Sequence, residues 1–170
     1  MRYAIAGKWS RPRFTIEDDE GKTQFEVARI YGLDGNSLSL RDPGDNELAA
    51  IRPRTGPTRF EVTAGGQPDI TVRHRGWFGK RYRIETPGGQ MTATIGDFSV
   101  KSYEIAGPGM IHVNVSRQFI RQQHLAIDLA DNEDPVSWLA IVLAIEALRD
   151  DRRQIESTIP FLRLLLRVIN

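Results

Sequence analysis

The 170-residue chain contains no cysteine, and this absence excludes several kinds of chemistry. Disulfide scaffolds, thiol catalysis, cysteine-ligated zinc and iron–sulfur clusters all require a thiol. A strong net charge is also missing, because 23 Lys and Arg residues are balanced by 22 Asp and Glu residues. The overall charge therefore favours neither nucleic acid nor an acidic substrate, and we expect no nucleic-acid partner.

Long apolar runs are absent as well. Residues 1–9 lack the apolar stretch of about 7–15 residues that a signal peptide needs. The sequence also contains no run of about 18 apolar residues, so we expect no ordinary transmembrane helix. The length and the composition, with 40% hydrophobic and 26% charged residues, suit one globular domain.

The common catalytic motifs are missing too. There are three histidines, His74, His112 and His124, and none forms an HExxH or HxxxH pair. His112 falls on the polar row of its segment, so we expect it to face solvent or a partner in a turn. Without a GxSxG, P-loop or GxGxxG sequence, we expect neither an enzyme nor a bound cofactor.

The pattern that is present, from Met1 to about Ala130, is alternation with a period of two. Apolar residues recur at every second position in segments such as 111–115 and 125–129, which is typical of half-buried strands. Glycine-containing turn signals such as Gly65-Gly66 and Gly88-Gly89 separate these segments. We count about twelve strands without βαβ alternation, which predicts an antiparallel sheet.

The pattern changes at Asp134, which can cap a helix predicted over Pro135–Leu148. Its only polar side chains, Ser137 and Glu146, point to opposite sides, so the helix has no polar face and must be surrounded by apolar groups. At about 21 Å it is too short to cross a bilayer core. The sequence therefore predicts an all-β antiparallel barrel of about twelve strands that encloses this helix. We place the barrel and its helix within residues 1–150 and an amphipathic tail within residues 151–170.

These segments resemble the LURP-one-related family, which shares the tubby C-terminal-like fold with phospholipid scramblases. The resemblance is carried by Leu38–Asp42, Gly96–Phe98, Tyr103–Ile105, Ile111–Phe119, Leu125–Asp128 and Asp134–Ile145. It implies a twelve-stranded antiparallel barrel around a hydrophobic helix, without known enzymatic activity. Tubby-like members bind phosphoinositide headgroups, and scramblase-like members act at membranes. The chain departs from the scramblases in lacking their cysteine cluster, and it carries an additional tail, Gln154–Asn170.

An acidic cluster precedes the helix and includes Asp128, Asp131, Glu133 and Asp134. Several carboxylates can hold Ca²⁺, and scramblase-like relatives have a Ca²⁺-responsive acidic segment in a similar region. No EF-hand spacing is present, so helix capping and solvation of a loop are the favoured interpretation, and no metal is expected.

The segment 73–83 is basic and aromatic and contains no acid. Its candidate headgroup-binding residues are Arg73, Arg75, Trp77, Phe78, Lys80, Arg81 and Arg83. Cations around aromatic rings suit an anionic membrane surface, although nucleic acid can use the same residues. The alternative is a hairpin with solvated arginines and with aromatic rings folded against the end of the barrel.

The tail predicts a short basic amphipathic helix. Arg163 and Arg167 share one face, and apolar residues that include Phe161, Leu162 and Leu166 form the other. This helix can lie on a membrane, on the barrel exterior or on a second subunit, and packing against protein is the more frequent outcome.

These observations lead us to expect a cytoplasmic, non-catalytic binding module. Its expected partners are anionic lipids at the inner face of a membrane. The alternative is a protein-interaction or homo-oligomeric scaffold that uses residues 155–170. An enzyme with a cleft at one end of the barrel is a third hypothesis, and it would need a cavity with converging titratable groups.

Overall fold

The computed structural model describes residues 1–6, 9, 11–32, 35–54, 59–65, 67–75, 81–95, 102–107, 110–120 and 122–150. Within these ranges the chain forms twelve strands, followed by one helix at residues 135–150. The strands are β1 (Arg2–Ala6), β2 (Arg13–Asp18), β3 (Thr23–Ile30), β4 (Ser37–Arg41), β5 (Glu47–Pro53), β6 (Arg59–Ala64), β7 (Gln67–Arg75), β8 (Arg81–Thr86), β9 (Gly89–Ile95), β10 (Ser102–Gly107), β11 (Met110–Ile120) and β12 (Gln122–Leu129).

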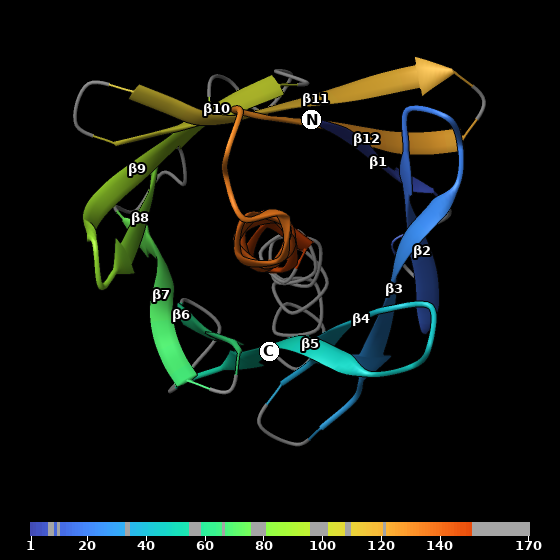
Figure 1. The fold of residues 1–170 in the computed structure, drawn as a ribbon. Helices are drawn as coiled ribbons and strands as arrows, with labels where there is room; N and C mark the ends of the chain where they lie inside the picture. The colour runs from blue at the N-terminus through green and yellow to red at the C-terminus, as the bar shows by residue number, and fades with distance from the viewer. Residues whose placement is uncertain are drawn as a thin grey trace, which may run out of the picture.

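The strands form a closed antiparallel barrel in which each strand pairs with its neighbours in the sequence. The first and last strands close it, with Arg2 opposite Asp128 and Ile5 opposite Leu125. Figure 1 looks along the barrel and shows the helix, in orange and red, in the middle of the ring of strands. Closure leaves no edge strand unpaired. The predicted fold, an antiparallel barrel around a hydrophobic helix, is confirmed.

The core lies between the inner face of the barrel and the helix. Alternate residues of the strands, such as Phe60 and Val62 of β6, are fully buried against it. The helix is buried on every side, because its side chains from Leu139 to Ile145 are at most 1% exposed. Glu146, the polar residue within its buried part, accepts a hydrogen bond of 2.7 Å from Arg149. A helix without a polar face is thus accommodated by a wall of apolar side chains around it.

The helix begins at one end of the barrel and runs to the other. At its start, the Asp134 carboxylate accepts hydrogen bonds from the backbone N–H groups of Val136 (3.3 Å) and Ser137 (3.0 Å), which confirms the predicted cap. At the opposite end, Asp150 forms an ion pair of 3.5 Å with the buried Arg29 of β3. The described chain therefore ends beside the last residues of β3.

Two details of the strand pattern differ from the expected alternation. In β5, Ala49, Ala50 and Ile51 are buried in succession, because the small Ala50 side chain lies on the outer face beside the buried Ser39 of β4. In β11, Ile111 does not join the buried row of Val113 and is 51% exposed.

The exposure of Ile111 has a local cause in the pairing of β10 with β11. Ile105 pairs with Val113 and Ala106 pairs with Ile111, which makes His112 an extra residue in β11. Such a β-bulge shifts the alternation by one position and re-aims the bulged side chain. The placement of Ile111 in the inward row by periodicity was therefore wrong.

Candidate functional site

Arginines gather on the outer face of three neighbouring strands, β6, β7 and β8. Arg59 pairs with Arg73 across β6 and β7, and Arg73 pairs with Arg83 across β7 and β8. Two residues further along β7, Arg75 pairs with Arg81 of β8. These side chains point outward, because residues next to them along the strands, namely Phe60, Val72 and Tyr82, are buried in the core. We call these five residues the arginine face.

Acidic side chains neutralise only part of the arginine face. Glu85 of β8 accepts a hydrogen bond of 2.8 Å from Arg73 and lies 2.9 Å from the Nε of Arg83. Arg75 and Arg81 are exposed, and the side chain of neither forms a hydrogen bond or ion pair with another described residue. Like charges directly opposite each other destabilise a sheet. An anion bound between Arg75 and Arg81 would relieve this repulsion.

The structure brings together four of the predicted headgroup-binding residues, namely Arg73, Arg75, Arg81 and Arg83. The other three, Trp77, Phe78 and Lys80, lie outside the described residues, as does the predicted tail helix with Phe161, Leu162, Arg163, Leu166 and Arg167. Arg59 precedes the segment 73–83 in the sequence and does not belong to it. The pairing of β6 with β7 places it directly beside Arg73.

Charge is also segregated along the barrel axis, although the net charge is only +1. At the end where the helix begins, which we call the acidic end, the turns carry Asp18, Asp19, Glu20, Asp42, Asp45, Asp131 and Asp134. At the end where the helix finishes, which we call the basic end, exposed arginines occupy or flank the strand ends: Arg11, Arg13, Arg52, Arg54, Arg59, Arg75 and Arg81. Arg11 and Arg13 were not recognised as candidates, because only closure of the barrel places β2 at the same end.

The cations of the acidic end do not remove this asymmetry. Arg2 forms an ion pair with Asp128 (3.2 Å) and Arg41 forms one with Asp45 (2.9 Å), so two of them are already matched. The pKa values of Asp18 and Asp42 lie below their ordinary value of 3.8, because each carboxylate accepts hydrogen bonds from its own turn.

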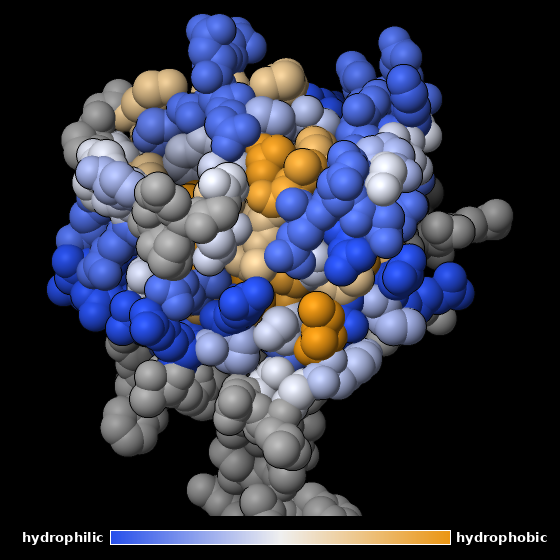
Figure 2. Space-filling view, turned by 60° about the horizontal axis from the view of Figure 1, so that its bottom comes forward, coloured by the Kyte–Doolittle hydropathy of each residue, from blue (hydrophilic) through white to orange (hydrophobic). Residues whose placement is uncertain are grey.

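Figure 2 shows the side of the barrel, where hydrophilic residues cover most of the surface around a strip of hydrophobic surface.

The four acids of the predicted cluster lie in four different environments. Asp128 pairs with Arg2, Asp134 caps the helix, and Asp131 is exposed in the turn. Glu133 accepts hydrogen bonds from two aromatic side chains, as described below. Within the described ranges, no group of three or more His, Asp and Glu side chains is arranged to hold a metal ion.

Glu133 joins the barrel wall to the start of the helix. Its Oε1 lies 2.6 Å from Nδ1 of His112, and its Oε2 accepts a hydrogen bond of 2.5 Å from the indole N–H of Trp138. The imidazole also stacks on the indole, with ring centroids 4.9 Å apart. Gly107 leaves room for this arrangement, because a Cβ there would lie 3.0 Å from Nε2 of His112. The sequence predicted that His112 faces either solvent or a partner in a turn. It did not predict this cluster, because the bulge that aims the ring depends on strand pairing.

The hydrogen bonds to Glu133 set its protonation. Burial raises the pKa of its carboxyl group, but the hydrogen bonds from His112 and Trp138 lower it by more, and the net pKa lies below the ordinary 4.5. A depressed folded-state pKa stabilises the fold above pH 4.5, and that stabilisation is lost as the pH falls through the lower folded value.

We therefore expect Glu133→Gln to lower the free energy of unfolding by about 1–3 kcal/mol near neutral pH, because hydrogen bonds to a charged acceptor are lost. The difference from the wild type should shrink as the pH falls below 4.5. Urea denaturation at a series of pH values measures it. A difference that stays constant or grows in acid would contradict this account of the cluster.

Among the residues that the structure describes, no helix is both long and apolar enough to cross a lipid bilayer.

Comparison with known proteins agrees with the architecture. Seven chains of solved structures match this chain. One is an X-ray structure of a protein from Arabidopsis thaliana, with a TM-score of 0.55 and 16% sequence identity, covering 89% of this chain and 91% of that chain. At this identity the likeness shows a shared fold alone. No curated protein matches.

The family comparison goes further than the structural one. The model of the LURP-one-related family matches residues 3–146, which include β1 from Tyr3 onward, all of β2 to β12 and most of the helix. This match covers far more than half of the chain and agrees with the resemblance seen in its sequence motifs. The chain therefore belongs to the LURP-one-related family.

Proposed function

We propose that this protein is a non-catalytic binding module that associates peripherally with membranes through anionic phospholipid headgroups. Family membership and the barrel fold support the assignment to a binding module. The observation that carries the lipid proposal is the segregation of charge along the barrel axis, with the arginine face at the basic end.

Attraction to a membrane depends on where the charges lie as well as on their sum. A lysine or arginine near an anionic membrane surface contributes roughly 1 kcal/mol, and the attraction fades within a Debye length of about 10 Å at 0.1 M salt. A uniformly mixed surface of net charge +1 would gain little at that distance. Here the basic end can approach the membrane while the acidic end stays several strand residues away.

The remaining headgroup-binding candidates follow, in the sequence, residues that lie at the basic end. Trp77, Phe78 and Lys80 lie in the connection between Arg75 and Arg81, and Asp150, the last described residue, pairs with Arg29 at the basic end. In the sequence, the segment that contains Arg163 and Arg167 follows Asp150. Aromatic side chains between cations suit the headgroup region, where rings lie at the boundary of polar and apolar layers.

Vesicle flotation tests the proposal with the full chain. We expect it to bind vesicles of phosphatidylcholine mixed with phosphatidylserine, to ignore vesicles of phosphatidylcholine alone, and to be released by 1 M salt, where the Debye length is about 3 Å. Binding should not require Ca²⁺. Equal binding to both vesicle types would contradict the proposal, and a requirement for Ca²⁺ would favour the acidic end as the contact.

The alternative function, a homo-oligomeric scaffold, depends on residues 155–170. Light scattering of the full chain and of a chain truncated after Arg153 discriminates the two. Loss of an oligomer on truncation would support the scaffold, whereas an unchanged mass with weaker vesicle binding would support the membrane proposal.

A further inference from the structure

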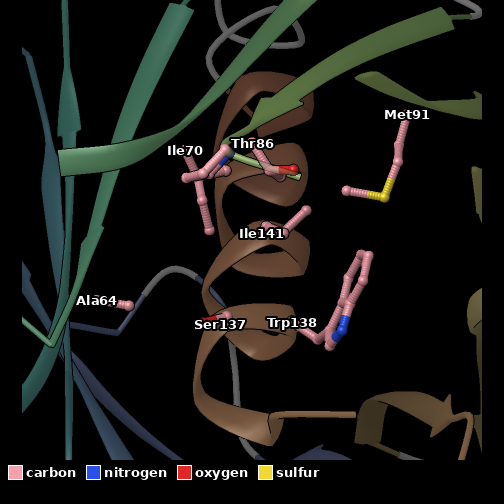
Figure 3. Close-up of a pocket in the computed structure, with 8 residues that line it drawn as sticks. Ala64, Ile70, Thr86, Met91, Ser137, Trp138 and Ile141 are labelled. Carbon is pink, nitrogen blue, oxygen red and sulfur yellow. The ribbon is translucent and has the colours of Figure 1, made fainter. Parts of the chain in front are cut away.

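A cavity remains at the acidic end, between the start of the helix and the barrel wall. Its volume is about 270 Å³, and its lining comes from strands β6, β7 and β9, from the β8–β9 turn and from the first two turns of the helix. Figure 3 shows Met91 and Trp138 facing each other on one side of the cavity, with Ile141 near its middle and Ile70 on the other side. Its walls therefore come both from the helix and from the barrel.

The described walls are mainly apolar. Besides the four side chains above, Ala64 contributes a methyl group, and none of the lining residues that the structure describes is Lys, Arg, Asp, Glu or His. Two hydroxyl groups are present. That of Thr86 donates a hydrogen bond of 3.1 Å to the carbonyl of Gly89, and Ser137 adds a second hydroxyl from the helix side. A ligand with an unpaired charge would lose its hydration here without gaining a counter-charge.

One wall of the cavity is held in place before any ligand arrives. The indole of Trp138 is bound to Glu133 through its N–H and stacks on His112. Its polar atom is thus occupied, so the indole offers its ring carbons rather than a hydrogen bond to the cavity. Preorganised apolar walls reduce the ordering cost of binding.

The volume of the cavity and the charge beside it limit the ligands that can bind there. The volume lies just below the range of about 300–1,000 Å³ of ordinary ligand pockets and equals roughly nine water molecules at about 30 Å³ each. The Asp134 carboxylate, which accepts a hydrogen bond from the backbone N–H of the lining residue Ser137, repels anions. The mouth of a β-barrel is a common position for such a site.

We propose that this cavity binds a small uncharged molecule that is apolar except for one hydroxyl or carbonyl group, with about ten non-hydrogen atoms. Aliphatic and aromatic alcohols belong to this class. The apolar part contacts Ile70, Met91, Trp138 and Ile141, and the oxygen meets the hydroxyl of Ser137. This site is separate from the arginine face, and the binding experiments below use the protein without vesicles.

The first measurement uses Trp138 as the reporter. In the full chain with Trp9→Phe and Trp77→Phe, Trp138 is the only tryptophan left of three. We expect benzyl alcohol and 1-hexanol to change its fluorescence in a saturable way, with dissociation constants of roughly 10 µM to 1 mM. Isothermal titration calorimetry on the unaltered chain should give the same constants. Absence of saturable binding of both alcohols by calorimetry would overturn the proposal.

Matched variants then locate the site. Ala64→Leu fills the cavity and should weaken binding at least about tenfold, whereas Ala28→Leu, on the outer face of β3, should leave it unchanged. If near-ultraviolet circular dichroism shows that Ala64→Leu is not folded, Ser137→Leu fills the cavity from the helix side with the same expected loss. Ser137→Ala should weaken binding by about 2–10-fold through its lost hydrogen bond. Unchanged binding in a folded cavity-filling variant would overturn the proposal.

Discussion

Replacing Ile145 with aspartate is expected to prevent the barrel from folding stably. The side chain is 0% exposed in the middle of a helix that is enclosed on every side. Substitution removes about 1.5–3 kcal/mol of apolar burial and places a carboxylate where the surrounding side chains are apolar. Together these losses exceed about 4 kcal/mol, a large part of the 5–15 kcal/mol that stabilises an ordinary domain.

The same substitution at Ile111 is the matched control. Ile111 follows the same sequence rhythm as its neighbours but is 51% exposed, so Ile111→Asp should change the free energy of unfolding by less than about 0.5 kcal/mol. Urea denaturation followed by circular dichroism compares the two variants. If Ile145→Asp were as stable as Ile111→Asp, the helix would not be essential to the barrel.

Removing the exposed arginine pair is expected to weaken binding to anionic vesicles by about 30-fold. Arg75→Ser combined with Arg81→Ser removes two cations that face each other across β7 and β8. At roughly 1 kcal/mol per cation near the membrane surface, the loss is about 2 kcal/mol. The folded state should be equally stable or slightly more so, because repulsion between opposite like charges is removed.

A second double variant isolates the effect of location. Arg2→Ser with Lys22→Ser changes the net charge by the same amount at the acidic end. We expect it to bind anionic vesicles within about twofold of the wild type, because its cations stay beyond the Debye length from the membrane. An equal loss in both double variants would mean that net charge, rather than the arginine face, governs binding. Vesicle flotation over a series of lipid concentrations measures both.

The helix could be predicted from the sequence alone, whereas strand β5 could not. The helix could be predicted because its composition has one physical solution: a helix with no polar face and too short for a bilayer must be enclosed by protein. The run Glu47-Leu48-Ala49-Ala50-Ile51 shows no alternation, and only pairing with β4 and β6 makes it a strand. Small residues such as Ala50 can be buried on either face, so their periodicity carries little information.

The candidate sites show the same division. Four arginines of the segment 73–83 could be grouped from the sequence because a hairpin brings its two strands together. The position of Arg59 beside them, and of Arg11 and Arg13 at the same end, depends on pairings between strands and on closure of the barrel. The cluster of His112, Glu133 and Trp138 depends on a bulge, which inserts one residue without a recognisable sequence signal.

The sequence by itself determined the strand-rich pattern, the capped apolar helix and the absence of thiol chemistry, because these follow from side-chain type and short-range spacing. Only the tertiary structure decided that the charges separate into an acidic and a basic end and that a cavity lies beside Trp138. The physical reason is that alternation fixes which face of a strand is buried, whereas closure of the barrel fixes which residues, far apart along the chain, share one end of it.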